Sequence, residues 1–116
     1  LSMTTRHKVF LVPFPFDDLS STKVRPAICL TDPVGPHRHV VLALITSQPV
    51  IAPLATDLVI DIHRADFGAT GLRVTSTARL HRLITVSTSM LARDLGSLSP
   101  ALQAQVTTRL RSLFQL

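Results

Sequence analysis

Short apolar runs, separated by prolines, glycines and hydroxyl-bearing residues, fill the first three quarters of the chain. Runs of this length bounded by turn-forming residues are typical of β-strands. Val40–Thr46 lacks polar alternation, as expected of a strand buried on both faces, whereas Leu72–Leu80 alternates with a period of two. The pattern predicts strands over Val9–Pro13, Pro26–Thr31, Val40–Thr46, Leu58–Ile62 and Leu72–Leu80.

Helical signals gather in the last quarter. Ser99-Pro100 is a favourable N-cap and first-turn pair. One apolar stripe then recurs at helical spacing: Leu102, Val106, Leu110 and Leu113. A shorter helix is predicted over Ser89–Leu95, capped by Ser87 or Thr88 and ended by Gly96. We therefore expect a mainly β protein, in which a small, strongly bent antiparallel sheet carries a C-terminal helix.

Length and composition indicate one globular domain. The chain has 116 residues, of which 46% are hydrophobic and 16% charged, so apolar surface is left over that dimerisation would cover. We expect residues 3–116 to form the domain, with Leu1 and Ser2 a cloning remnant ahead of a natural start at Met3. No apolar run approaches the ~20 residues of a membrane span, and no signal peptide precedes the first strand, so we expect a cytoplasmic protein without a membrane partner.

The net charge is positive, and each sign of charge comes mostly from one residue type. Twelve Lys and Arg outweigh seven acids for a net charge of +5, and ten of the twelve are Arg. Either genomic codon composition or binding to phosphate accounts for that excess of Arg. All seven acids are Asp, so any carboxylate acid or base is an Asp. Cys29 is the only cysteine, which excludes an intrachain disulfide, and its place in an apolar run favours an inert thiol.

Three groups of polar residues are candidates for chemistry. Arg25 precedes a proline, which confines its backbone to the extended region and fixes a cation where an anion could bind. An apolar strand ends abruptly in three polar residues, Thr46, Ser47 and Gln48. They form either a simple turn or a site at the edge of the sheet, and spacing alone favours the turn.

Arg79 and His81 lie on one face at strand spacing. They could stabilise and protonate a phosphate oxygen, although the spacing alone favours a solvated basic edge. The pair His37 and His39 offers too few ligands for a metal site.

Five motifs occur in a fixed order along the chain: VFLVPFPFDDLSSTKVRPAICL at 9–30, LITSQ at 44–48, DFGATGL at 66–72, ARLHRL at 78–83 and LGSLSPALQAQVTTRLRSLF at 95–114. With these motifs the chain resembles the MazF/PemK-like toxins of bacterial type II toxin–antitoxin systems over nearly its whole length. The resemblance implies a compact SH3-like barrel of the MazF/CcdB toxin type and a homodimer. It also implies an endoribonuclease that cuts single-stranded RNA without a metal or other cofactor.

The resemblance also implies site residues and partners. Arg25 matches the cleavage-associated arginine of the family's K-x-R-P motif, and Thr46 the threonine that binds the reacting phosphate. The resemblance further implies that Ser47, Arg79 and the loop Asp17–Lys23 bind RNA, and we expect base contacts from Phe16, Asp18 and Gln48. The expected protein partner is a MazE/PemI-like antitoxin, whose acidic tail fills the basic groove and with which the toxin binds DNA.

Two positions depart from the family pattern. His7-Lys8 stands where Gly-Asp usually opens the first strand, and His81 stands where many relatives have an aspartate. Either His81 replaces that aspartate as a proton-transfer group, or the site relies on Arg25 and Thr46 and His81 is a bystander. Two other functions stay open: a CcdB-like gyrase poison, against which the phosphate-binding residues argue, and a silent module that binds RNA or antitoxin.

Overall fold

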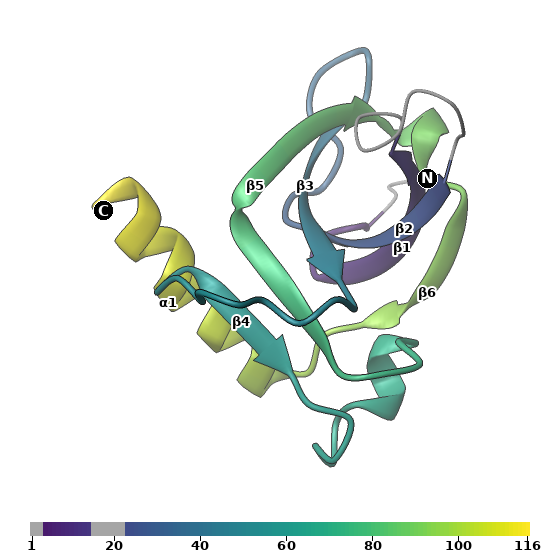
Figure 1. Cartoon of the computed structure of the whole chain (residues 1–116). Helices are drawn as coiled ribbons and strands as arrows, with labels where there is room; N and C mark the ends of the chain where they lie inside the picture. The colour runs from purple at the N-terminus through teal and green to yellow at the C-terminus, as the bar shows by residue number, and fades with distance from the viewer. Residues whose placement is uncertain (1–3, 15–22) are drawn as a thin grey trace.

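A curled antiparallel sheet with an α-helix packed outside it makes up the fold (Figure 1). The computed structural model describes residues 4–14 and 23–116. Within these ranges the sheet has six strands in the order β4-β5-β3-β2-β1-β6. The elements are β1 (Lys8–Phe14), β2 (Lys23–Cys29), β3 (His39–Thr46), β4 (Asp57–Ile60), the 3₁₀ turn η1 (Gly68–Thr70), β5 (Ser76–Ser87), the 3₁₀ turn η2 (Thr88–Met90), β6 (Arg93–Ser97) and α1 (Pro100–Phe114).

Apolar side chains form a core on each face of the curled sheet. The three strands β1, β2 and β3 contribute to both cores, because successive side chains of a strand point to opposite faces. One core, packed against α1, contains Val9, Ile28, Ala43, Ile45, Leu80, Leu102 and Val106 among others. The other contains Phe10, Val12, Ala27, Cys29, Val40, Leu42 and Leu44. Burial of β3 on both faces, predicted from its unbroken apolar run, is confirmed.

β5 is the longest strand and bends sharply along its length (Figure 1). It begins at Ser76 rather than at the predicted Leu72, because β4 ends at Ile60 opposite Ser76 and leaves residues 72–75 without a strand to pair with. It also continues to Ser87. Against β3 its register shifts: Leu44 is opposite Arg79 and Ala43 is opposite Leu83. The three residues between form a bulge, and a bulge bends a strand and redirects its side chains.

The helix predicted over Ser89–Leu95 is wrong. Its first residues form only η2, where the Ser87 hydroxyl accepts a hydrogen bond from the Ser89 N–H at 3.3 Å. The chain then enters β6, which pairs with β1. Gly96 therefore ends no helix; a Cβ at this position would lie 2.1 Å from the Ala69 carbonyl oxygen, so glycine allows η1 to approach β6.

The C-terminal helix agrees with its prediction. Ser99 caps α1 by accepting from the Leu102 N–H at 3.1 Å, and Pro100 is its first residue. Leu102 and Val106 of the apolar stripe are fully buried against the sheet. No helix in the described ranges has the length and apolar character needed to cross a membrane.

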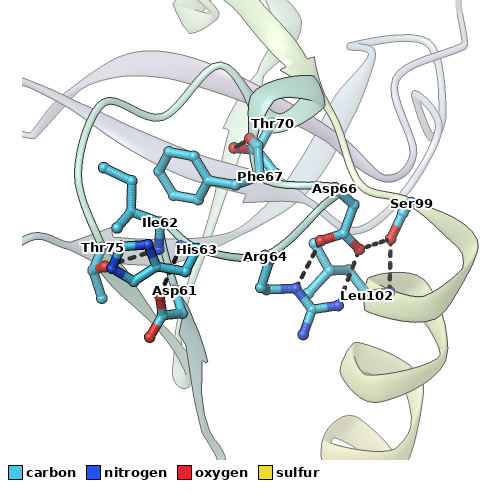
Figure 2. A network of polar contacts seen from close by, with 10 residues as sticks. All are labelled: Asp61, Ile62, His63, Arg64, Asp66, Phe67, Thr70, Thr75, Ser99 and Leu102. Atoms are coloured by element: carbon cyan, nitrogen blue, oxygen red, sulfur yellow. Dashed lines mark hydrogen bonds and ion pairs between the residues drawn. The ribbon is translucent and has the colours of Figure 1, made fainter.

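An ion-pair network fastens the loop after β4 to the start of α1 (Figure 2). The Asp66 carboxylate accepts hydrogen bonds from Arg64 Nε at 2.7 Å and Nη2 at 3.0 Å. The Ser99 hydroxyl, which caps α1, also donates to Asp66. The bonds from Arg64 first, and then that from Ser99, hold the pKa of Asp66 well below its usual range.

Replacing Asp66 tests whether this network stabilises the fold. Because the pKa of Asp66 is lower in the folded chain, its stabilisation is present above its unfolded pKa of about 3.9 and is lost as the pH falls below that value. Asp66→Asn therefore lowers the melting temperature most near neutral pH, and the difference from the wild type shrinks towards pH ~2. Thermal unfolding across this pH range measures it. Asp61→Asn in the same loop is the control, and an equal pH dependence of both variants would contradict this role.

Candidate functional site

An open groove with a volume of about 560 Å³ lies over the neighbouring strands β2, β3 and β5. Its polar lining comes from Arg25 of β2, Thr46 and Gln48 at the end of β3, and Arg79 and Arg82 of β5. The segment 48–52, between β3 and β4, forms its rim. The groove thus gathers three arginines and a hydroxyl around one opening.

Arg25 and Thr46 come together because of strand register. β2 and β3 are antiparallel, with Ala27 opposite Leu44. Continuing this register by two residues sets Arg25 level with Thr46, and both line the groove. Arg25 is half-buried, and Pro26 keeps its backbone extended. The register therefore joins two residues that the sequence picks out separately.

Thr46 has a hydroxyl with a proton to donate. Its Oγ1 accepts the Gln48 backbone N–H at 3.1 Å, which forms the simple turn expected as the alternative to a site. A hydroxyl that accepts one bond still donates its own hydrogen to another group. Thr46 belongs to a turn and to the groove at once, so the two alternatives do not exclude each other.

Arg79 is held at the groove by a carboxylate that the sequence analysis did not single out. Asp57, the first residue of β4, accepts from Arg79 Nε at 3.0 Å and from Nη2 at 3.3 Å. The Asp57 side chain is only 1% exposed. Burial raises its pKa, but the Leu54 N–H bond and the Arg79 guanidinium outweigh burial and leave the pKa below its usual value. Asp57 is therefore ionised at neutral pH.

The bulge in β5 separates His81 from Arg82. His81 does not belong to the groove lining; its Nδ1 lies 4.0 Å from Asp57 Oδ1, near the carboxylate that binds Arg79. Arg82 lines the groove instead. Strict alternation from Arg79 would turn Arg82 to the opposite face, and for this reason the sequence pattern did not identify Arg82.

The remaining predicted residues lie around or beyond this groove. Ser47 is exposed and lines two adjoining hollows, one of which also contains Arg73 and Arg93. Lys23 is exposed at the start of β2. Phe16 and Asp18 lie outside the described residues.

Two sequence-based exclusions concern metal and thiol chemistry. Across residues 4–14 and 23–116, no three His, Cys, Asp or Glu side chains cluster closely enough to hold a metal ion. Cys29 is fully buried, its Sγ donates to the Thr31 carbonyl at 3.1 Å, and burial raises the pKa of its thiol. A buried, protonated thiol is a poor nucleophile, as the sequence predicted.

The family of the chain follows from its sequence over nearly its whole length. Residues 5–114 match the model of the PemK-like, MazF-like toxins of type II toxin–antitoxin systems, and the chain belongs to this family. The resemblance drawn from its motifs is thereby confirmed. A search among curated proteins finds no significant match.

Solved structures share the fold. An endoribonuclease in complex with its cognate antitoxin, from a mycobacterial species, superposes with a TM-score of 0.72 at 16% identity, covering 98% of this chain and 97% of that chain. The Mycobacterium tuberculosis toxin MazF-mt6 gives a TM-score of 0.71 at 23% identity, with 94% and 97% covered. The predicted mainly β fold with a C-terminal helix is confirmed, as a half-barrel of the MazF toxin type.

Proposed function

We propose that this protein is an endoribonuclease toxin that cuts single-stranded RNA without a metal ion. The observation that carries the proposal is the groove in which Arg25, Thr46 and Arg79 converge from separate strands. Family membership supports the toxin role, and the mycobacterial structure described as an endoribonuclease has the same fold. The reaction is an attack of the RNA 2′-hydroxyl on its adjacent phosphodiester, which leaves a cyclic phosphate and a free 5′-hydroxyl.

The groove supplies what this reaction needs most. Negative charge grows on the phosphoryl oxygens as the 2′-oxygen attacks, and fixed cations and donors lower the free energy of that state. The Arg25 guanidinium and the Thr46 hydroxyl would bind the reacting phosphate. Arg79 and Arg82 would neutralise the phosphates on either side, since all four residues line one opening. Binding across these strands would also hold the RNA for in-line attack.

Proton transfer is assigned separately. Arginine, with a pKa above ~12, is a poor acceptor, so Arg25 acts by charge and by donation. His81 is the candidate acid or base because its imidazole is solvent-accessible and an imidazole can both accept and donate a proton. Its place beside Asp57, outside the groove lining, requires bound RNA to extend past Arg79 to reach it.

Base selection is proposed for the groove margins. Gln48 lines the groove, Ser47 lines the adjoining hollows, and Lys23 is exposed at the start of β2. Phe16 and Asp18 are proposed from the sequence alone. Amide and carboxylate groups read base edges, and a phenyl ring stacks on a base.

The proposed partners follow from the positive charge of the groove. The mycobacterial endoribonuclease is bound to its cognate antitoxin, and a basic groove on a chain with a net charge of +5 suits an acidic antitoxin tail as well as RNA. We further propose a cytoplasmic homodimer in which residues 3–116 form one domain. We also propose, from the family resemblance, that the toxin binds DNA together with its antitoxin.

Purified protein incubated with long single-stranded RNA and EDTA tests the activity. Arg25→Ala and Thr46→Ala are expected to lower the cleavage rate on the order of 10²–10³-fold, because each removes a group that stabilises charge in the transition state. Circular dichroism should show both variants folded. Arg111→Ala on α1, which removes the same charge, is the control and should cut normally.

The products also distinguish the alternatives. Discrete cuts with 5′-hydroxyl ends support the proposal. Binding without cuts would instead favour the silent module, and neither binding nor cuts would favour a gyrase poison. Full activity of Arg25→Ala would contradict the assignment of the groove.

The role of His81 has its own readout. If His81 transfers a proton, the rate of the wild type inflects near neutral pH, and His81→Asn loses this inflection along with most of the rate. Single-turnover cleavage measured from pH 5.5 to 9 tests it, with His63→Asn in the exposed loop as a control. An unchanged profile in His81→Asn would remove His81 from the mechanism.

A further inference from the structure

Among the carboxylates whose contacts the structure describes, Asp57 has the least exposed side chain. Its side chain is 1% exposed, whereas that of Arg79, its ion-pair partner, is 24% exposed. Burying a carboxylate is costly unless hydrogen bonds and an opposite charge compensate for lost water. An aspartate at this buried position therefore needs compensating partners, and the groups that Asp57 binds indicate its role.

One carboxylate connects Arg79 to the segment between β3 and β4. Oδ1 accepts from Arg79 Nε at 3.0 Å, and Oδ2 accepts from Arg79 Nη2 at 3.3 Å. Oδ2 also accepts the Leu54 N–H at 2.8 Å, while the Asp57 N–H returns a bond to the Leu54 carbonyl at 3.0 Å. Leu54 closes the segment whose residues 48–52 form the groove rim. Arg79 and the β3–β4 segment that carries the rim are thus bound by the same side chain.

The backbone of Asp57 is itself fixed. It is paired with Arg79 in the ladder between β4 and β5. Arg109 of α1 donates from Nε to the Asp57 carbonyl at 3.2 Å. A side chain mounted on a paired strand and braced by a helix is a rigid support for the cation it binds.

We propose that Asp57 is a positioning residue that holds Arg79 and the 48–52 rim in place for the reacting RNA. This inference rests on the proposed function. Two of the guanidinium's donors bind Asp57, and the others stay available to phosphate at the groove. Without the carboxylate, three arginines around one opening would repel one another, and Arg79 would adopt other rotamers.

Asp57→Asn is the sharp test, because it keeps the shape and removes an acceptor. In one orientation the amide nitrogen would face Arg79 Nε, and in the other it would face both Arg79 Nη2 and the Leu54 N–H, so Arg79 loses a hydrogen bond either way. We expect kcat for RNA cleavage to fall about 10²-fold, as when a group is displaced by about 1 Å. KM should rise far less, because the charge that Arg79 stabilises grows in the transition state.

The chain contains a matched control. Asp66 also binds an arginine through two hydrogen bonds, but it serves the loop and the helix start shown in Figure 2. Asp66→Asn should lower the melting temperature and leave kcat of the folded protein unchanged. Equal losses of kcat in the two variants would mean that Asp57 contributes only to stability.

A double-mutant cycle tests whether Asp57 acts through Arg79. Asp57→Asn combined with Arg79→Ala should lose much less rate than the product of the two single losses, because only the rim is then left for Asp57 to position. Rate losses that multiply would overturn the proposal.

A measurement without catalysis separates this inference from the proposed function. In ¹⁵N–¹H NMR spectra, the Arg79 Nε–H signal should be protected from exchange in the wild type and exposed in Asp57→Asn. It should also shift when an uncleavable 2′-O-methyl RNA oligonucleotide is added. An unprotected wild-type signal would refute the role of Asp57. A protected signal that does not shift with RNA would refute RNA binding at Arg79, and with it the proposed function of the groove. A wild type that shows both responses but cuts no RNA would refute only the nuclease activity.

Discussion

Burial of the central strands on both faces limits where polar groups can occur in this fold. Ala27, Ile28 and Cys29 of β2 are fully buried, as are Val40, Leu42 and Ala43 of β3. An unpaired charge in either stretch would be costly. Polar side chains therefore appear where these cores end, at Arg25 on β2 and at Thr46 on β3. Because the two strands are antiparallel neighbours, both residues lie at the same end of the sheet and share one groove.

The part of the groove that β5 contributes depends on the bulge in that strand. The bulge in β5 directs Arg82 to the groove, and the ladder to β4 brings Arg79 next to Asp57. Three arginines around a small opening repel one another, and one buried carboxylate offsets only part of this charge. The net positive potential that remains is what an RNA backbone or an acidic peptide would neutralise.

Residue patterns predicted the features that depend on local sequence. The apolar runs indicated β1 to β3, and Ser99-Pro100 indicated the start of α1. Proline after Arg25 and the abrupt polar end at Thr46 pointed to half of the groove. The helix predicted after Ser87 failed because pairing with β1 and the close approach of η1 to Gly96 decide the structure there. These are tertiary contacts with no local signal.

The same limit applies to Asp57 and Arg82. Asp57 looks like an ordinary loop aspartate until the strand order sets β4 beside β5, and Arg82 reaches the groove only through the bulge. The central claim is that this groove binds the reacting phosphate, and a crystal structure with an uncleavable 2′-O-methyl RNA tests it most directly. The account predicts one phosphate within hydrogen-bonding distance of both the Arg25 guanidinium and the Thr46 hydroxyl. RNA bound elsewhere, with Arg25 and Thr46 uncontacted, would contradict it.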